Sequence, residues 1–320
     1  MQYVKINALR KIYSGGFVLG EINLQIDRGE IFTLMGPSGS GKTSLLRNIS
    51  GLDSPDTGEI IISNRDVTGL PVDRRNIGLI FQDLALFPHM SAYDNIAYGL
   101  RSRRISEKVI NGKVEEFASL LRIENVLDRF PSMISGGERQ RVALARSIIM
   151  SPDLLLMDEP MSSLDPELRL EVRAEIKKIS KKLDLTIIYV THDIQEGLFL
   201  GDKVGVIFRG KLVKTDTPEN MFLNPQSEET ARFFGYNVIK WKQGTFAVHP
   251  SDMDISGVAT DFEGTVETVG FEGGNYRIAV NYGSDEILQV LAKYSDSRKG
   301  IKPGDRLFLE IKRKIRITEP

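Results

Sequence analysis

The stretch Gly36-Pro37-Ser38-Gly39-Ser40-Gly41-Lys42-Thr43 decides how the first part of this chain folds. It matches G-x-x-x-x-G-K-[ST], a pattern whose glycines let backbone N–H groups surround the oxygens of a phosphate. The apolar run before it, residues 31–35, has the character of a buried strand, and residues 44–49 have the character of a helix. Since the start of a helix carries partial positive charge, this setting predicts a nucleotide site that includes Ser44.

Two side chains of this loop suit a polyphosphate. We expect Lys42 to reach the terminal phosphates and the Thr43 hydroxyl to ligate Mg²⁺. The alternative is a glycine-rich turn that matches the pattern by chance. The loop by itself does not indicate what the nucleotide drives.

The composition excludes several classes of function. With 42 basic and 43 acidic residues the net charge is −1, so the charge balance gives no sign of binding to nucleic acid. The absence of Cys excludes disulfides and thiol catalysis and fits a reducing compartment. No apolar run approaches the ~20 residues of a membrane-spanning helix, and the first residues lack the plan of a signal peptide. We therefore expect a cytoplasmic protein whose membrane role, if any, depends on a partner.

The chain of 320 residues has room for about two domains. Residues 1–235 alternate short apolar runs with helical patterns, which predicts an α/β domain with a largely parallel sheet. Between about 88 and 150 the pattern is more helical and polar, which indicates a helical subdomain inserted into that domain. The expected inner strands are 77–81, 154–158, 186–190 and 204–208.

The pattern changes near Tyr236. Short alternating segments follow, separated by turns such as 272–275 and 302–305. Residues 236–320 are therefore expected to form a second domain, a small closed β-barrel.

A second motif agrees with the phosphate loop. Four apolar residues, 154–157, lead into Asp158 and Glu159, the pattern of a strand that ends beside a phosphate site. Asp158 would then hold Mg²⁺, and Glu159 could act as the general base on the attacking water. The alternative is a buried strand that ends in two solvated carboxylates.

A third motif indicates a family. Ile134-Ser135-Gly136-Gly137-Glu138-Arg139-Gln140-Arg141-Val142-Ala143 resembles the signature of the ATP-binding-cassette (ABC) ATPases. Gln82 within 81–83, Ser163-Leu164-Asp165 and His192 within 190–193 occur in the family's order. The resemblance covers residues 1 to about 235 and implies a P-loop NTPase core that hydrolyses ATP with Mg²⁺.

The resemblance also implies roles for single residues. Ser135-Gly136-Gly137 forms a second helix-start cradle for an anion, which in the family holds the ATP of a facing copy. The expected assembly is thus a head-to-tail homodimer that closes around two ATP. The family further implies that Tyr13 stacks on adenine, Gln82 senses Mg²⁺ and the permease, His192 contacts the γ-phosphate, and Asp165 touches the phosphate loop of the other copy.

Other segments resemble the importer branch of the family. Residues 86–90 and 94–97 resemble the stretch that meets a permease, and the C-terminal barrel with 249–252 resembles the accessory TOBE (OB-like) domain of solute importers. This implies membrane permease subunits as partners, indirectly an extracytoplasmic solute-binding protein, and a position on the inner face of the membrane. Because 231–235 lacks residues associated with the sugar group, we expect an inorganic ion, oxyanion or polyamine as cargo.

Two other classes remain open at this point. A soluble ABC ATPase of repair or translation would normally carry a second cassette or a long coiled-coil insertion, and the sequence has neither. An exporter ATPase would usually be fused to or matched by membrane spans, without this barrel. The barrel itself could bind a regulatory ligand or only stabilise a dimer.

Overall fold

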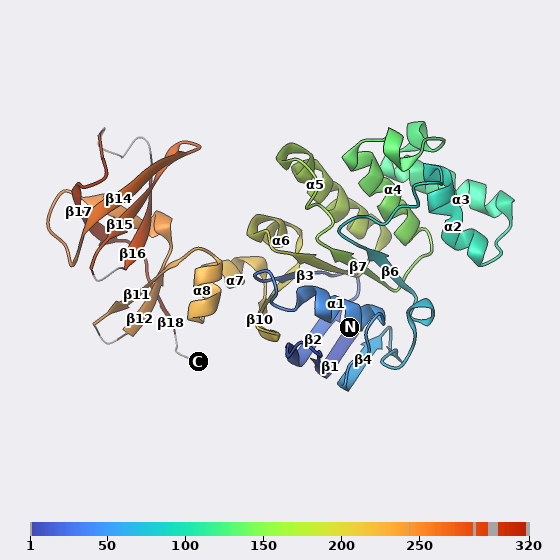
Figure 1. The fold of residues 1–320 in the computed structure, drawn as a ribbon, viewed down its shortest axis with the longest axis horizontal. Helices are drawn as coiled ribbons and strands as arrows, with labels where there is room; N and C mark the ends of the chain where they lie inside the picture. Colours follow the sequence, from blue (N-terminus) through green and yellow to red (C-terminus); the bar gives the residue numbers. More distant parts are fainter. Residues whose placement is uncertain (1, 243, 284–285, 294–299, 318–320) are drawn as a thin grey trace. The chain divides into compact units, whose positions relative to one another are not determined.

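The computed structural model describes residues 2–242, 244–283, 286–293 and 300–317. The chain divides into two compact units, Met1–Glu219 and Asn220–Pro320, which are considered separately (Figure 1). Among the described residues, no helix is both long and apolar enough to cross a membrane.

The first unit is built on a six-stranded sheet of order β10-β9-β3-β8-β7-β6. Its strands are β3 (Ile31–Met35), β6 (Ile77–Ile80), β7 (Leu154–Asp158), β8 (Ile187–Thr191), β9 (Lys203–Phe208) and β10 (Lys211–Asp216). All neighbours run parallel except β9 and β10. Every residue of β3, β7 and β8 is buried, as expected for strands covered on both faces. The predicted parallel sheet is confirmed.

The register of this sheet brings three strand ends together. Met35 pairs with Thr191, and Met157 pairs with Tyr189. The carboxyl ends of β3, β7 and β8 therefore meet at one edge, and the residues that follow these strands are brought to the same place.

A second, antiparallel sheet was not predicted from the sequence. It has the order β2-β1-β4-β5, from β1 (Gln2–Ile12), β2 (Val18–Asp27), β4 (Thr57–Ile62) and β5 (Arg65–Asp66). One hydrophobic core joins Val4 and Ile22 of this sheet, Leu45 of α1 (Lys42–Ser50) and Leu34 of β3. Figure 1 shows α1 beside β1, β2 and β4. The helix that starts at the phosphate loop is thus held by both sheets.

The helical subdomain lies between β6 and β7 in the sequence, as predicted. It comprises α2 (Ala92–Ser102), α3 (Glu107–Leu121) and α4 (Gly136–Ile148), with the short 3₁₀ turns Glu124–Val126 and Pro131–Met133 between α3 and α4. A further 3₁₀ turn, Val72–Arg74, precedes β6 and lies outside the subdomain. The core of the subdomain includes Ile96, Val114 and Val142, and continues into Ile176 of α5 (Pro166–Leu183). A short helix, α6 (Ile194–Leu200), follows β8.

Every strand pair in the described residues of the second unit is antiparallel, which confirms an all-β C-terminal fold. One sheet has the order β11-β12-β18 and the other β13-β17-β14-β15-β16. The bounds are β11 (Asn237–Trp241), β12 (Gly244–Val248), β13 (Met253–Ser256), β14 (Phe262–Glu272), β15 (Asn275–Asn281), β16 (Ile287–Lys293), β17 (Arg306–Ile311) and β18 (Ile315–Ile317), with a 3₁₀ turn at Pro250–Asp252. Both sheets contribute to one core, from Ile239 in β11 to Leu309 in β17.

The second unit also includes residues ahead of its first strand. Helix α7 (Pro218–Leu223) begins at the division between the units, and α8 (Glu228–Phe233) follows it. The Tyr236 hydroxyl donates to the Phe222 carbonyl at 2.8 Å, and the rings of Phe222 and Phe234 meet edge to face. These contacts join residues 220–235 to the β unit, whereas the boundary predicted from the sequence follows residue 235.

Candidate nucleotide-binding site

The loop between β3 and α1 needs its glycines. Gly36, Gly39 and Gly41 have φ of 154°, 75° and 108°, in the region that side-chain-bearing residues rarely adopt. A Cβ on Gly36 would lie 2.3 Å from the carbonyl oxygen of Ile207, and one on Gly41 would lie 2.9 Å from the Phe17 ring. The loop could therefore not keep this path with larger residues at these positions.

Lys42 stands at the start of α1 and is buried to 5% exposure. Its Nζ donates to the carbonyl oxygens of Gly36 at 2.8 Å and Pro37 at 3.0 Å. Burial lowers the pKa of Lys42, and the nearby carboxylates of Glu159 and Asp158 oppose this effect. Since Nζ bonds only neutral carbonyls in the described part of the chain, its charge stays available for an anion.

Asp158 ends β7 beside the start of α1. Thr43 Oγ1 donates to Asp158 Oδ1 at 3.4 Å. Burial raises the pKa of Asp158, although the hydrogen bond from Thr43 works in the opposite direction. Thr43, Asp158 and Gln82 line one cavity and offer a hydroxyl, a carboxylate and an amide oxygen. Oxygen donors of this kind fit Mg²⁺, which prefers hard oxygen ligands.

Glu159 and His192 lie close together although they follow two different strands, β7 and β8. Oε2 of Glu159 is 2.9 Å from Nδ1 of His192. The Glu159 amide donates to the Val190 carbonyl at 3.0 Å, and its φ of 45° is unusual for a residue with a long side chain. Strained backbone of this kind concentrates at functional sites. The carboxylate is thus held in place at the edge where β7 and β8 end.

A cavity of about 560 Å³ is lined by Lys42, Thr43, Asp158 and Glu159, whereas His192 is not among its lining residues. Ten of its lining residues were predicted from the sequence: Tyr13, Ser38, Gly39, Gly41, Lys42, Thr43, Ser44, Gln82, Asp158 and Glu159. Gly36, Pro37 and Ser40 belong to the loop without lining the cavity. The buried Ser40 hydroxyl has no hydrogen-bond partner among the residues that the structure describes. Sequence reasoning missed Phe17, whose ring lies 6.0 Å from that of Tyr13. The only local signal for it was an aromatic residue next to the Gly15-Gly16 turn.

The Tyr13 ring is fixed by its hydroxyl. That hydroxyl donates to Asp53 Oδ2 at 3.0 Å and accepts from Asn48 Nδ2 at 3.1 Å. Partial burial raises the pKa of Tyr13, and Asp53 adds to this effect. Because Asn48 belongs to α1, the ring keeps a fixed position relative to the helix that carries Lys42.

The predicted second cradle lies outside this cavity. Ser135 caps α4: its Oγ accepts from the Glu138 amide at 3.3 Å, while Glu138 Oε2 accepts from the Ser135 amide at 2.8 Å. The hydrogen bonds that the Ser135 amide and hydroxyl donate to the Glu138 carboxylate lower the pKa of that carboxylate. Asp165 caps α5 by accepting from the Leu168 amide at 2.9 Å. None of Ser135, Gly136, Gly137 and Asp165 lines the cavity of their own chain.

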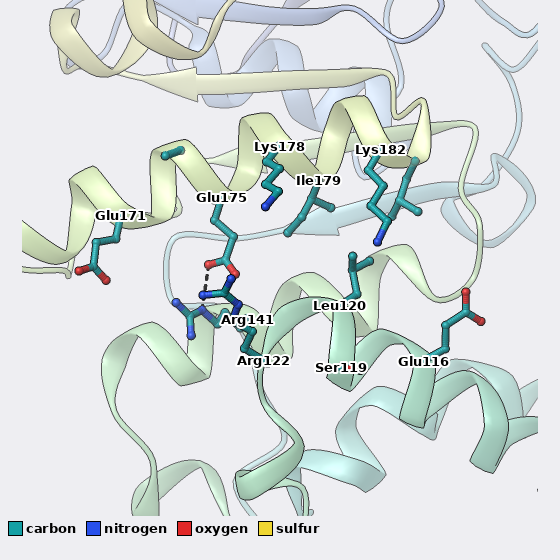
Figure 2. Close-up of a pocket in the computed structure, with 12 residues that line it drawn as sticks. Glu116, Ser119, Leu120, Arg122, Arg141, Glu171, Glu175, Lys178, Ile179 and Lys182 are labelled. Atoms are coloured by element: carbon teal, nitrogen blue, oxygen red, sulfur yellow. Dashed lines mark hydrogen bonds and ion pairs between the residues drawn. The ribbon is translucent and has the colours of Figure 1, made fainter.

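Another hollow of about 790 Å³ lies between α3, α4 and α5 (Figure 2). An ion pair of 2.9 Å between Arg141 of α4 and Glu175 of α5 crosses it at one end. It shares no lining residue with the cavity at the phosphate loop. The candidate site for a nucleotide is therefore the cavity at the phosphate loop.

Comparisons with known proteins agree with this geometry. A model of the ABC transporter family matches residues 19–162, and a model of the TOBE domain matches residues 246–314. The first range includes the phosphate loop, Asp158 and Glu159, and the second lies within the all-β unit. The two matches thus fall on the two different parts of the chain.

Two curated relatives span most of this chain. It is 38% identical to the molybdate/tungstate import ATP-binding protein WtpC of Pyrococcus horikoshii, over 97% of both chains. It is also 38% identical to the spermidine/putrescine import ATP-binding protein PotA of Spiroplasma citri, over 87% of both. Among solved structures, CbiO1 of Clostridium perfringens, part of the ABC transporter complex CbiONQ, matches with a TM-score of 0.65 and 31% identity, over 72% of this chain and 94% of that one. The chain belongs to the family of ABC transporter ATP-binding proteins and carries a TOBE domain after its ATPase fold.

Proposed function

We propose that this chain is the ATP-hydrolysing subunit of an ABC importer. The observation that carries the proposal is the meeting of Lys42, Thr43, Asp158 and Glu159 around one cavity at the start of α1. The family supports it, because both relatives described above are import ATP-binding proteins. Subunits of this kind, which bind ATP in ABC importers, are ATPases.

In this proposal the loop binds the triphosphate of ATP. Backbone N–H groups of the loop and the positive end of α1 face the phosphates, and Lys42 adds a full charge. Tyr13, fixed by Asn48 and Asp53, stacks on the adenine ring, and Phe17 beside it extends the apolar wall.

The ligands proposed for Mg²⁺ are Thr43, Asp158 and Gln82. Mg²⁺, when bound, neutralises part of the negative charge that develops on the phosphate oxygens. The described residues contain no group of three His, Cys, Asp or Glu side chains that could hold a metal. A single carboxylate with a hydroxyl and an amide suits an ion that keeps phosphate and water as its other ligands.

For hydrolysis we assign the proton acceptor to Glu159. A water oxygen attacks the γ-phosphorus, the bond to the bridging oxygen breaks towards ADP, and Glu159 accepts the proton that the water loses. His192, 2.9 Å from Glu159, holds that carboxylate and faces the γ-phosphate with its other nitrogen. A positioned general base of this kind raises the rate of the reaction by ~10²–10⁴-fold.

We further propose a head-to-tail homodimer. Ser135, Gly136, Gly137 and Asp165 all lie outside the cavity of their own chain. His192 also lies outside it but is joined to it by its contact with Glu159, whereas the four residues at the starts of α4 and α5 could act on the γ-phosphate of a second copy. In the dimer each phosphate loop would face the α4 start of the other copy, and two ATP would be enclosed. ATP would then favour the dimer because it binds both surfaces.

The proposed partners are membrane permease subunits that bind near residues 86–90, and indirectly an extracytoplasmic solute-binding protein. The chain would work at the cytoplasmic face of the membrane, without nucleic acid. The relatives favour an oxyanion such as molybdate or tungstate, or a polyamine, over a sugar as cargo. A repair, translation or exporter ATPase is less well supported, because the TOBE match extends over 246–314.

Copurification tests the importer assignment. A tagged Glu159→Gln chain, isolated with ATP from gently solubilised membranes of its own organism, should bring down a polytopic permease. Vesicles holding that complex and its binding protein should take up molybdate or spermidine only with internal ATP. Recovery of ribosomes or DNA-repair proteins in place of a permease would contradict the importer assignment and leave the ATPase assignment standing.

A further inference from the structure

The Gln82 side chain has no hydrogen bond of its own among the described residues, so its position depends on the backbone around it. The Leu84 amide donates to the Phe81 carbonyl at 2.9 Å, which closes a turn with Gln82 and Asp83 at its two corners. Leu84 anchors this turn in the core at 7% exposure, while Gln82 is exposed. The place of the Gln82 amide therefore depends on what holds this turn, residues 81–85.

The turn contains unfavourable backbone. Leu84 and Ala85 have φ of 58° and 43°, so two consecutive residues with a Cβ occupy the left-handed region. Such conformations persist only where surrounding contacts impose them. A specific contact must therefore hold Leu84 and Ala85.

Arg146 of α4 supplies that contact. Its Nη2 donates to the Leu84 carbonyl at 2.8 Å and its Nη1 to the Ala85 carbonyl at 2.7 Å. The ring of Phe87 lies 5.7 Å from the guanidinium carbon. Burial lowers the pKa of Arg146, and Asp83 is the carboxylate that opposes this effect. Because Arg146 forms no ion pair among the described residues, its guanidinium is held by the hydrogen bonds to the Leu84 and Ala85 carbonyls.

The chain just beyond the turn is held independently. Asn95 is fully buried and accepts from the Phe87 amide at 2.8 Å, while its Nδ2 donates to the carbonyls of Phe87, Met90 and Ser91. Removing the Arg146 contacts should thus free residues 82–85 and leave 87–91 in place.

We propose that Arg146 is a positioning residue that sets Gln82 for the Mg²⁺ site by holding the Leu84–Ala85 carbonyls. The inference rests on the proposed role of Gln82 as a ligand. Arg146 lies near the C-terminal end of α4, and Ser135 caps the N-terminal end of the same helix. A movement of α4 as a rigid element would be passed to Gln82 through Arg146.

Hydrogen exchange and Mg²⁺ dependence test the proposal in the full-length protein. Arg146→Lys keeps the charge but cannot donate to both carbonyls in the same geometry. Without nucleotide, its Leu84 amide should exchange about tenfold faster while the Phe87 amide keeps its rate. The Mg²⁺ concentration for half-maximal binding of a fluorescent ATP analogue, and for half-maximal hydrolysis, should rise about five- to tenfold.

Two further variants guard against a general loss of stability. Ala85→Gly relieves the backbone strain at position 85 without touching α4, so it should melt no lower than the parent. Added to Arg146→Lys, it should reduce the rise in Leu84 exchange. Arg141→Lys is the matched control: it alters an arginine of the same helix that pairs with Glu175 and should change neither readout.

A double variant separates this proposal from the role of Gln82. If Arg146 acts through Gln82, Arg146→Lys should add nothing to the Mg²⁺ defect of Gln82→Ala. Additive defects, or unchanged Leu84 exchange in Arg146→Lys, would overturn the positioning role. If Gln82→Ala alone left the Mg²⁺ dependence unchanged, the ligand role of Gln82 would fail, and faster Leu84 exchange would still support the clamp on the turn.

Discussion

The Nδ1 atom of His192 lies 2.9 Å from Oε2 of Glu159, across 33 residues of sequence. The contact exists because β7 and β8 are parallel neighbours, so the residues that follow them emerge at the same edge of the sheet. The imidazole is more than half exposed, whereas the carboxylate is largely covered. His192 is therefore placed to reach a ligand on one side and to hold Glu159 on the other.

Replacing His192 should affect turnover more than binding. We expect His192→Ala to lower kcat by about 10²-fold, because Glu159 loses its neighbour and the γ-phosphate loses a contact. KM for ATP should change less than threefold, since Lys42 and the loop remain. Steady-state ATPase assays check this split. A large rise in KM with an unchanged kcat would show that His192 serves ground-state binding.

The ionised carboxylate of Asp158 should destabilise the folded state in the absence of Mg²⁺. Burial raises its pKa, so the folded state binds the proton more tightly than the unfolded state. Its contribution to stability is thus present at low pH and lost as pH rises through the raised pKa. Asp158→Asn should therefore raise the melting temperature at pH 7 without Mg²⁺ and abolish Mg²⁺-dependent hydrolysis.

Asp66→Asn is the control of opposite sign. Hydrogen bonds from Thr68 lower the pKa of Asp66, so its ionised form favours the folded state above the unfolded pKa. This variant should melt slightly lower at pH 7 and keep its ATPase activity. A lower melting temperature for Asp158→Asn would contradict the destabilising role of the buried carboxylate.

The position of the domain boundary can be tested with fragments. Residues 220–320 should give a cooperative thermal transition, because Phe222 contacts Phe234 and His249 and accepts from Tyr236. A fragment that starts at residue 236 lacks these contacts and should melt several degrees lower. Differential scanning calorimetry of both fragments would measure the two melting temperatures and test this difference. Equal melting temperatures would show that folding does not depend on residues 220–235.

The proposed dimer can be trapped with two engineered thiols. The chain contains no Cys, so Ser38→Cys and Ser135→Cys introduce single reactive groups on the two cradles. With Glu159→Gln to prevent hydrolysis, a short bifunctional thiol reagent should give covalent dimers with ATP and far fewer without it. The two single-thiol variants are the controls. Products that are intramolecular, or independent of ATP, would exclude a head-to-tail dimer.

Part of this structure could be predicted from local sequence and part could not. The loop around Lys42 and the strand before Asp158 were accessible because each needs particular residue types within a few positions. Phe17 was not, since its place over Gly41 comes from packing between distant segments. The antiparallel sheet of β1, β2, β4 and β5 was missed because its strands are half-exposed and lack long apolar runs. Arg146 was missed for the same kind of reason: its acceptors lie 61 and 62 residues earlier.

A comparison of Lys42→Ala with Glu159→Gln tests most directly whether this chain hydrolyses ATP at the phosphate loop. ATP binding by titration calorimetry and turnover by phosphate release should be measured for both variants and the parent. Lys42→Ala should weaken binding at least tenfold, because an anion loses a buried cation. Glu159→Gln should bind ATP normally, and its turnover number should fall by ~10²–10⁴-fold because an amide cannot accept the proton. Near-normal turnover in Glu159→Gln, or unchanged affinity in Lys42→Ala, would contradict the site as described.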